Sequence, residues 1–301
     1  MVKYHSVQVG KDCVIRMIKE VIMAENAGFC FGVKRAVDTS IDLNNNNSTN
    51  IYTFGPLVHN KNVTSNLKEK GINEINISEL NKLSSCDTVI IRSHGVTPKV
   101  MELIRSTGAK VIDATCPYVS AIHKKIKKYY DLGYQIIIIG DENHPEVIGS
   151  NGWCDDSAII TKDGSNLHDL TQKVCIVVQT TEKKENFDKV VDIVSGKCCD
   201  VVTFNTICSA TKERQTSAEE TSKKVDVMLV VGSKDSSNTT KLYEICRKNC
   251  SNTIFVENSC DIPEWVFDNK NITKIGVTAG ASTPDWIIEQ VLDKIDGTTD
   301  K

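Results

Sequence analysis

The sequence predicts an α/β protein built from three similar units, each with a small, mostly parallel sheet. Two observations predict this class. Short runs rich in Val and Ile alternate with helical patterns along the 301 residues, and such alternation is typical of parallel units joined by right-handed crossovers. One spacing of cysteine, glycine and a polar residue also occurs three times along the chain. The alternation fixes the class, and the repeat fixes the number of units.

Most of the expected strands are continuous apolar runs, as in parallel strands that are covered on both faces. We expect strands at residues 21–24, 50–54, 88–92, 110–113, 135–139, 158–161, 174–179, 225–231, 253–256 and 275–278. Helical patterns lie between them, at residues 61–70, 99–107, 120–132, 183–194, 212–224 and 240–248. The polar tract at residues 44–48 is expected to be a surface loop.

Each copy of the repeat begins at a cysteine where an apolar run gives way to a helical pattern, at Cys30, Cys116 and Cys208. A glycine that closes the next apolar run follows after 25, 24 and 24 residues, and a polar residue stands four positions further on. These residues are Gly55 with His59, Gly140 with His144, and Gly232 with Ser236. Three copies in register imply three α/β units that each present one thiol to a common centre.

The repeat also suggests domain boundaries. Residues 1–20 precede the first copy as an N-terminal extension, and the units span residues 21–115, 116–207 and 208–301. The first strand, at about residues 21–29, is also compatible with packing in the third unit. No long linker rich in proline or glycine separates the units, so we expect them to pack into one body.

The composition excludes several classes of protein. Hydrophobic residues make up 40% and charged residues 25% of the chain, as in globular proteins. A net charge of −3 argues against a nucleic-acid-binding surface. No apolar run approaches the roughly 20 residues that span a bilayer, and the first residues lack the pattern of a signal peptide. We expect a cytoplasmic protein with no nucleic-acid or membrane partner.

Twelve cysteines without an export signal indicate packing residues or metal ligands rather than disulfides. Those in or beside apolar stretches are interpreted as packing residues: Cys86, Cys175, Cys246 and Cys250. The three repeated thiols could instead hold an iron–sulfur cluster, because a helix N-terminus after each one favours the thiolate. A cubane cluster has four irons, so three cysteines would leave one iron open for catalysis. The absence of a C-x₂-C pair argues against structural zinc.

Polar residues at the strand ends predict an anion site, because ligands bind beyond the carboxyl ends of parallel strands. Small donors suited to a phosphate or diphosphate are His59, His94, Ser236, Ser237 and Asn238. The last three are equally compatible with a helix N-cap.

The tripeptide His144-Pro145-Glu146 is expected to form a loop, because proline disfavours helix in the residue before it. Glu146 in a partly apolar pocket would stay protonated and could donate a proton. A solvated surface loop is the alternative.

The segments AGFCFGVKRAV, GPLVHN, SHGV, DATCP, HPEV, QTT, ICSATKERQ, VVGSKDSSNT and GVTAGASTPD occur in this order. With them, the chain from about residue 21 to 292 resembles the 4-hydroxy-3-methylbut-2-enyl diphosphate reductases. The resemblance implies three α/β units in a pseudo-threefold arrangement around a central [4Fe–4S] cluster. It also implies reductive dehydroxylation of (E)-4-hydroxy-3-methylbut-2-enyl diphosphate to isopentenyl and dimethylallyl diphosphate, the last step of the non-mevalonate isoprenoid pathway. An electron donor such as ferredoxin or flavodoxin would be a partner.

The resemblance also implies roles for single residues. Cys30, Cys116 and Cys208 match the cluster ligands, Glu146 matches the proton donor, and Thr180 matches a threonine near the substrate hydroxyl. The residues that match the diphosphate-binding positions are His59, His94, Ser236, Ser237, Asn238 and Ser282, with His144 as a substrate-contacting histidine beside them.

Two other functions stay open from the residues alone. One is a cluster-dependent hydro-lyase for a small anionic substrate, which would need no electron donor. The other is a non-catalytic iron–sulfur sensor or zinc-binding scaffold. Protein that is brown after anaerobic purification would favour a cluster over zinc.

Overall fold

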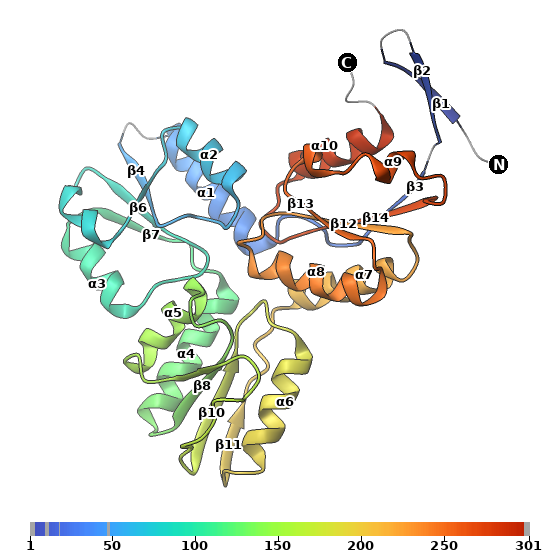
Figure 1. Cartoon of the computed structure of the whole chain (residues 1–301). Helices are drawn as coiled ribbons and strands as arrows, with labels where there is room; N and C mark the ends of the chain where they lie inside the picture. Colours follow the sequence, from blue (N-terminus) through green and yellow to red (C-terminus); the bar gives the residue numbers. More distant parts are fainter. Residues whose placement is uncertain (1–3, 10–11, 18, 47–48, 298–301) are drawn as a thin grey trace. The chain divides into compact units, whose positions relative to one another are not determined.

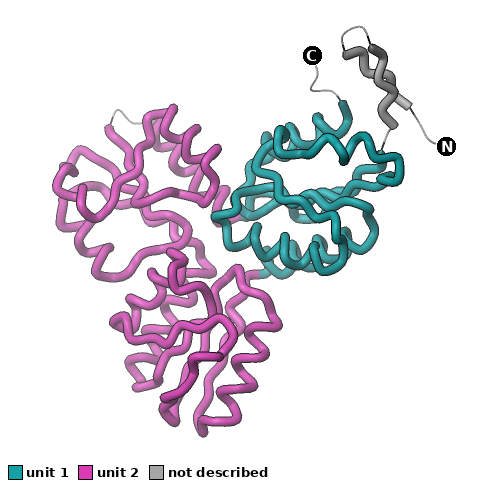
Figure 2. The backbone as a smooth tube through the Cα atoms, in the orientation of Figure 1, with its two compact units in different colours: residues 1–30, 209–301 teal, residues 31–208 magenta. Residues whose placement is uncertain are grey.

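Three four-stranded sheets, parallel throughout, confirm the predicted α/β class. The structure is a computed structural model that describes residues 4–9, 12–17, 19–46 and 49–297. The chain divides into two compact units, residues 31–208 and residues 1–30 with 209–301 (Figure 2). Both crossings between the units therefore come directly after a repeated cysteine, Cys30 or Cys208.

The unit of residues 31–208 contains two of the sheets. The first has the strand order β5 (Asn73–Ile75), β4 (Ile51–Phe54), β6 (Thr88–Ile91) and β7 (Lys110–Asp113). The helical segments that accompany it are α1 (Phe31–Asn46), α2 (Lys61–Glu69), η1 (Ile77–Lys82) and α3 (Pro98–Ser106) (Figure 1). Val89 and Ile91 of β6 are fully buried and pack in one cluster with Ile104 of α3.

The second sheet of this unit has the order β11 (Asp200–Thr203), β10 (Lys173–Val178), β8 (Gln135–Ile139) and β9 (Ile159–Thr161). Its helical segments are α4 (Pro117–Asp131), α5 (Pro145–Asn151), η2 (Gly152–Cys154) and α6 (Lys184–Ser195). Successive β8 side chains alternate between two cores, because side chains of a strand point to opposite faces. Ile137 and Ile139 pack with α6, and Ile136 and Ile138 pack with α4. This two-sided burial explains why the strand is continuously apolar.

The other unit contains the third sheet, in the order β13 (Thr253–Val256), β12 (Val227–Val231), β14 (Lys274–Ala279) and β3 (Glu20–Met23). Figure 1 shows α7 (Ser209–Ser222) and α8 (Ser237–Asn249) on one face of the sheet, with α9 (Trp265–Asp268) and α10 (Asp285–Asp296) on the other. The same unit includes η3 (Ser259–Asp261). β12 is buried along its whole length, as expected for a strand between two helical layers.

Near the N-terminus, β1 (Tyr4–Val9) and β2 (Asp12–Met17) pair antiparallel. Of the predicted extension 1–20, residues 1–3, 10–11 and 18 lie outside the described residues. β3 follows and pairs with β14, so the first strand of the repeat lies in the sheet of the C-terminal residues. The boundaries 21–115, 116–207 and 208–301 stay a prediction.

The expected loop at residues 44–48 is wrong over its first part, because α1 continues to Asn46. There the amide Nδ2 of Asn44 donates a hydrogen bond to the backbone carbonyl of Lys70 at 2.8 Å. This bond satisfies a polar side chain without ending the helix. Residues 47–48 lie outside the described residues.

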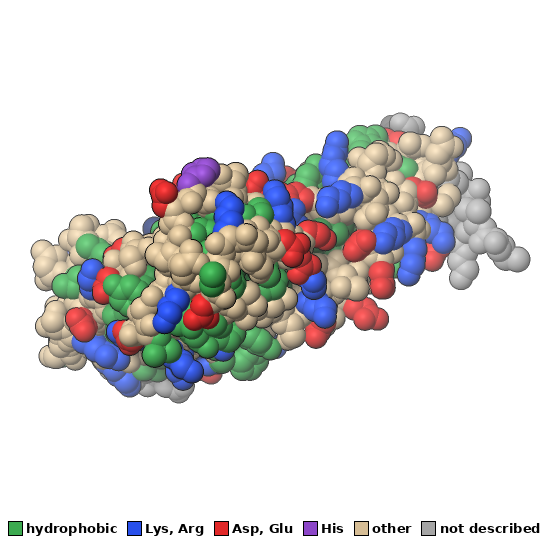
Figure 3. Space-filling view, turned by 90° about the horizontal axis from the view of Figure 1, so that it is seen from below, with side chains coloured by type: hydrophobic (Ala, Val, Ile, Leu, Met, Phe, Trp, Pro, Cys, Tyr) green, Lys and Arg blue, Asp and Glu red, His purple; other side chains and the backbone are tan. Residues whose placement is uncertain are grey.

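Figure 3 shows the surface from one side, where acidic and basic side chains are interspersed with each other and with hydrophobic and other side chains. This mixture agrees with the small net charge of −3. Within the described ranges, no helix is long and apolar enough to cross a membrane.

Two glycines, Gly149 and Gly152, lie where α5 and its C-terminal end approach the segment after β6. A Cβ added to Gly149 would lie 3.4 Å from the carbonyl carbon of Gly95, and one added to Gly152 would lie 2.4 Å from Cβ of Thr97. The first distance is an ordinary van der Waals contact and the second is a clash, so this close approach depends on Gly152. It brings the helix of the second sheet against the loop of the first.

We expect Gly152→Ala to lower the free energy of unfolding by about 1–3 kcal/mol, because the methyl group overpacks against Thr97. Gly196→Ala is a matched control, since its nearest neighbour would be Asp192 O at 3.7 Å. Urea unfolding of both variants measures the difference. Equal urea midpoints for the two variants would contradict the close contact between Gly152 and Thr97.

Candidate active site

The three repeated cysteines are held by the same hydrogen bond. Each cysteine donates its backbone N–H to the carbonyl that lies two residues beyond a central strand, namely β14, β6 or β10. The bonds are Cys30 to Ala281 at 3.1 Å, Cys116 to Ser93 at 2.9 Å, and Cys208 to Thr180 at 3.1 Å. The spacing that occurs three times in the sequence thus corresponds to a backbone hydrogen bond that occurs three times in the structure. Cys116 and Cys208 belong to one unit and Cys30 to the other.

A helix begins at the residue after each of these cysteines: α1 at Phe31, α4 at Pro117 and α7 at Ser209. A helix N-terminus favours a negatively charged group such as a thiolate. All three cysteines are partly exposed, and none forms a disulfide. A Cβ added to Gly32 would lie 2.8 Å from Sγ of Cys116, so this glycine leaves room beside the sulfur. These thiols therefore suit a soft metal centre such as an iron–sulfur cluster.

Four other cysteines within the described ranges are buried, and burial raises the pKa of each thiol. The raised values reach about 12 for Cys175 and Cys246, and the pKa values of Cys154 and Cys250 are raised as well. Such thiols stay protonated and are poor ligands, and the predicted packing role of Cys175, Cys246 and Cys250 agrees with their burial. The same prediction for Cys86 is wrong.

Cys86 is exposed, because it lies in a polar turn ahead of β6. Its backbone N–H donates to Oγ of Ser84 at 3.3 Å, and the same hydroxyl donates to Asp87. The apolar strand begins only at Thr88.

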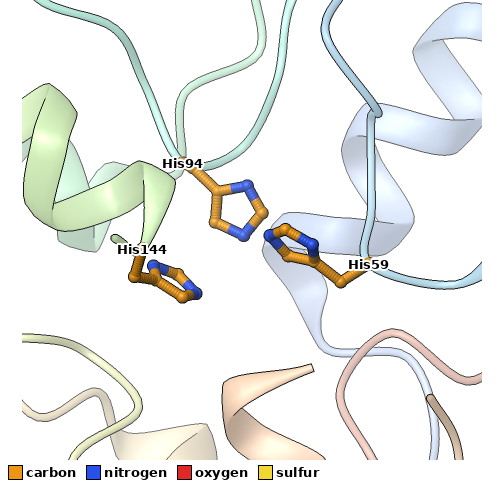
Figure 4. A group of neighbouring side chains, drawn as sticks. All are labelled: His59, His94 and His144. Atoms are coloured by element: carbon orange, nitrogen blue, oxygen red, sulfur yellow. The ribbon is translucent and has the colours of Figure 1, made fainter. Parts of the chain in front are cut away.

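Three histidines from different loops and helix starts form a cluster (Figure 4). The ring centroids are 5.1 Å apart for His59 and His94, 5.6 Å for His59 and His144, and 5.3 Å for His94 and His144. His59 precedes Asn60, the N-cap of α2, while His144 is the N-cap of α5 and His94 follows β6. Residues separated by 85 positions thus meet at one point.

Burial lowers the pKa of His94 well below its usual value, and His144, Arg92 and His59 lower it further by positive charge. His94 is therefore neutral in this state. Its buried Nδ1 has no hydrogen-bond partner among the described residues. The Nε atom of Arg92 is likewise buried without a partner in that part of the chain. Positive groups and unsatisfied polar atoms at one place indicate that an anion is the missing component.

One nitrogen atom from each of the three rings lies within 4.8 Å of the other two, a spacing that could also suit a metal ion. The hydrogen bonding of His144 argues against this use. Its Nδ1 accepts the backbone N–H of Glu146 at 3.2 Å, so in the neutral ring the proton is on Nε2. His144 therefore presents a donor rather than a lone pair, and a cluster with such a donor suits an anion.

The prediction that His144-Pro145-Glu146 forms a loop is wrong. His144 has extended backbone angles, φ −76° and ψ 133°, and α5 begins at Pro145. Proline is well suited to the first position of a helix, because that position needs no N–H donor. The extended residue before the proline serves as the N-cap.

Glu146 and Thr180 form a buried pair that links the two halves of the second sheet. Oε1 of Glu146 accepts the backbone N–H of Thr180 at 2.7 Å, and Oε2 accepts the Thr180 hydroxyl at 2.6 Å. Glu146 is 2% exposed and Thr180 is 7% exposed. The carbonyl of Thr180 also accepts the N–H of Cys208. One residue thus connects a buried carboxyl group to a candidate thiol ligand.

In the other unit, the N-terminus of α8 meets the loop after β14. Oδ1 of Asn238 accepts the N–H of Ala281 at 3.0 Å, and the carbonyl of Ala281 accepts the N–H of Cys30. Nδ2 of Asn238 is buried and has no partner within the described residues. This amide has an unused donor, which is what an anionic ligand requires.

The serines lie around this amide. Ser236 is the N-cap of α8, and its Oγ accepts the N–H of Thr239 at 3.4 Å, so the N-cap alternative is correct for this residue. Oγ of Ser237 accepts a hydrogen bond from Nζ of Lys241 at 3.1 Å. Ser282 is buried and follows Ala281 in the chain. Helix N-termini of this kind also bind anions, so capping does not exclude a binding role.

The predicted site residues thus form two groups. One unit brings together His59, His94 and His144, and joins Glu146, Thr180 and Cys208 by hydrogen bonds, with Cys116 on the equivalent bond to Ser93. The other unit brings together Cys30, Ser236, Ser237, Asn238 and Ser282. Sequence reasoning missed Arg35 and Arg214, which bind the loops ahead of two of the cysteines.

The sequence profile of the LytB protein family matches residues 21–296. The chain belongs to the LytB family. A 4-hydroxy-3-methylbut-2-enyl diphosphate reductase of Clostridium perfringens strain SM101 is 52% identical over 279 residues, which cover 93% of this chain and 99% of that protein. The predicted family is therefore confirmed, and it is an iron–sulfur family.

Relatives of different length share this match. The reductase of the same name from Clostridium acetobutylicum is 54% identical over 280 residues, which cover 92% of this chain but 44% of that protein. A reductase of Clostridium tetani is 53% identical and is covered over 43% of its length. The chain thus spans less than half the length of these two LytB relatives.

Solved structures of the family support the fold. A structure of (E)-4-hydroxy-3-methyl-but-2-enyl diphosphate reductase, the terminal enzyme of the non-mevalonate pathway, is 40% identical with a TM-score of 0.70, and the match covers 93% of this chain and 99% of the other. The E-1-hydroxy-2-methyl-but-2-enyl-4-diphosphate reductase of Plasmodium falciparum is 29% identical with a TM-score of 0.84, covering 91% and 87%.

Proposed function

We propose that this LytB chain is an iron–sulfur oxidoreductase. It removes the hydroxyl group of (E)-4-hydroxy-3-methylbut-2-enyl diphosphate and yields isopentenyl and dimethylallyl diphosphate. The relatives that carry this name support the reaction. The observation that carries the proposal is the chain of bonds from the buried Glu146 through Thr180 to the backbone of Cys208. It couples a proton source to a thiol ligand.

Cys30, Cys116 and Cys208 would hold a [4Fe–4S] cluster with one iron open. Their shared backbone geometry, partial exposure and position before helices support this set over the buried cysteines. When bound, the cluster supplies electrons and a Lewis-acid position for the substrate hydroxyl. The electrons come from a donor protein such as ferredoxin or flavodoxin. A cytoplasmic location stays a prediction.

The residues that would bind the diphosphate group are His59, His94, His144, Ser236, Ser237, Asn238 and Ser282. Support comes from the unused donor Nδ2 of Asn238 and the unpartnered Nδ1 of His94, both buried. A buried donor without a partner costs roughly 1–3 kcal/mol. A ligand that accepts these hydrogen bonds recovers this free energy, which selects for an anion rich in oxygen atoms.

Glu146 acts as the proton donor to the departing hydroxyl group, and Thr180 orients it. The two hydrogen bonds from Thr180 fix both carboxyl oxygens, so the carboxyl group does not rotate. The Thr180 hydroxyl can also pass a proton, because a hydroxyl both donates and accepts. Burial of this pair excludes bulk water from the proton path.

The test is an anaerobic assay with the hydroxylated C5 diphosphate and a chemically reduced electron carrier. We expect both isomeric diphosphates as products, and no turnover without the reductant. Turnover without reductant would instead indicate the hydro-lyase. Colourless protein that contains zinc and lacks activity would favour the non-catalytic scaffold.

Because the folded pKa of His94 lies below its unfolded value of about 6.5, the unfolded chain binds more protons. The stability from this group is therefore lost as the pH falls below about 6.5. An anion beside the ring reverses the shift, so ligand binding should take up protons. The measurement is calorimetric titration with inorganic pyrophosphate at pH 7 in two buffers, which gives the number of protons taken up on binding. We expect wild type to take up as many as about one proton more than His94→Asn.

His168→Asn provides the control for this titration, since His168 is exposed and lies outside the cluster. Comparison of variants at one pH cancels the titration of pyrophosphate itself. The same proton uptake in wild type and His94→Asn would exclude His94 as the titrating group.

A further inference from the structure

An arginine in α1 holds the loop ahead of Cys116. Arg35 lies five residues after Cys30, and its Nη2 donates to the carbonyls of Ala114 at 3.0 Å and Thr115 at 2.6 Å. These are the two peptide groups directly before Cys116. The helix that begins after one candidate ligand therefore fixes the backbone that carries another, 80 residues away.

An arginine in α7 holds the loop ahead of Cys30 in the same manner. Arg214 lies six residues after Cys208 and is 3% exposed. Its Nη2 donates to the carbonyl of Gly28 at 2.9 Å, and its Nη1 donates to Ala210 of its own helix at 2.9 Å. Gly28 precedes Cys30 by two residues and has φ +93°. A left-handed residue allows the sharp turn that aims this carbonyl at the arginine.

A weaker contact completes the cycle. Nζ of Lys125 in α4, nine residues after Cys116, lies 5.0 Å from the ring centroid of Phe204, which precedes Cys208 by four residues. The helix after each cysteine thus contacts the segment before the next one. Of these three contacts, those of Arg35 and Arg214 are hydrogen bonds to the loop backbone, whereas that of Lys125 is a cation–π contact.

Arginine is suited to this task because its planar guanidinium group presents several donors in fixed directions and keeps its charge. Loop carbonyls near a ligand lack the partners that a helix or sheet would provide, and such bonds restrict them. Groups behind the direct ligands of a metal centre commonly orient those ligands, and their loss costs about 10–100-fold in metal affinity.

We propose that Arg35 and Arg214 are positioning residues that fix the Cys116 and Cys30 loops for cluster binding. This inference rests on the proposed function, because it takes these cysteines as ligands. Its specific content is a crossed dependence. The loss of Arg35 disturbs Cys116, and the loss of Arg214 disturbs Cys30. Each ligand loop thereby depends on the helix that starts at a different cysteine.

The test uses Arg35→Gln, Arg214→Gln and the exposed control Arg247→Gln, whose guanidinium contacts Tyr243 and the Ser251 carbonyl at the surface. In anaerobic holoprotein, we expect a ferrous chelator to remove iron at least about tenfold faster from the first two variants than from wild type or the control. The midpoint potential of the cluster, followed by electron paramagnetic resonance, should shift in these two variants as well.

Alkylation of the iron-free protein gives a readout that needs no cluster. With iodoacetamide and peptide mass spectrometry, Arg35→Gln should raise the rate at Cys116 selectively, and Arg214→Gln the rate at Cys30, because a loosened loop exposes its thiol. Cys86, which is exposed already, serves as the internal reference. If Cys30 and Cys116 react faster together with the buried Cys175, the variant is merely unfolded.

For a glutamine variant that does not fold, Arg35→Lys and Arg214→Lys carry the test, since they keep the charge and lose the fixed fork of donors. The inference would be overturned if the Arg35 and Arg214 variants matched Arg247→Gln in iron retention, midpoint potential and alkylation rates. The proposed function would remain intact in that case. Wild-type protein without a cluster would instead overturn the proposed function.

Discussion

Replacement of Glu146 by glutamine is expected to lower kcat by about 10³-fold while leaving the iron content unchanged, since general acids contribute roughly 10²–10⁴-fold. Glutamine has the same shape, and its carbonyl can still accept the N–H of Thr180 that now lies 2.7 Å from Oε1. Its amide can donate to the Thr180 hydroxyl. The geometry survives, but the side chain has no acidic proton to give.

Glu185→Gln is the matched control, because Glu185 is an exposed carboxylate in the first turn of α6. Anaerobic turnover with reduced carrier is measured for both variants, together with iron content and the visible absorption of the cluster. Activity of Glu146→Gln within about twofold of the control would remove Glu146 from proton transfer. Loss of iron in this variant would instead assign it a structural role.

The central strands of this fold could be predicted from sequence because they are buried on both faces. β8, β10 and β12 are nearly all apolar, with Val and Ile the most frequent residues, and their burial on both faces explains the continuous apolar run. Two edge strands, β5 and β11, were not predicted, whereas the edge strands β3, β7, β9 and β13 were. β5 is Asn-Glu-Ile with two exposed residues, and β11 is only partly buried. These two strands obtain their structure from backbone pairing with a neighbour, which leaves little mark on their composition.

At the site, the sequence predicted features that lie within each repeat but not the contacts between residues far apart in the chain. The threefold spacing of cysteines, glycines and polar residues marked the cysteines, His59, His144 and Ser236 as equivalent, because it is local in each unit. It could not show that Glu146 bonds Thr180 across 34 residues, or that Arg214 bonds Gly28 across 186. One signal was present, however. Arginines follow Cys30 and Cys208 by five and six residues in two copies of the repeat.

Replacement of Cys116 by serine is expected to lower the bound iron by at least about tenfold and to abolish most of the activity. The thiolate is the ligand that iron–sulfur clusters require. Even the loss of a group that only orients a ligand lowers metal affinity by about 10–100-fold. The iron-free protein should be unharmed. Cys116 is the N-cap of α4 and makes no side-chain capping bond, whereas serine is among the best N-cap residues and adds up to about 1 kcal/mol.

Cys175→Ser gives the opposite pattern and is therefore the informative control. Cys175 is fully buried in β10, and burial raises the pKa of its thiol to about 12. A hydroxyl group placed there should cost about 1–3 kcal/mol of stability without loss of iron. Iron by colorimetric assay and thermal unfolding of the iron-free protein separate the two effects. Full iron content in Cys116→Ser would contradict the proposed ligand set. Only Cys30 and Cys208 of the repeat would then remain, so the third thiolate would have to come from a cysteine outside the repeat.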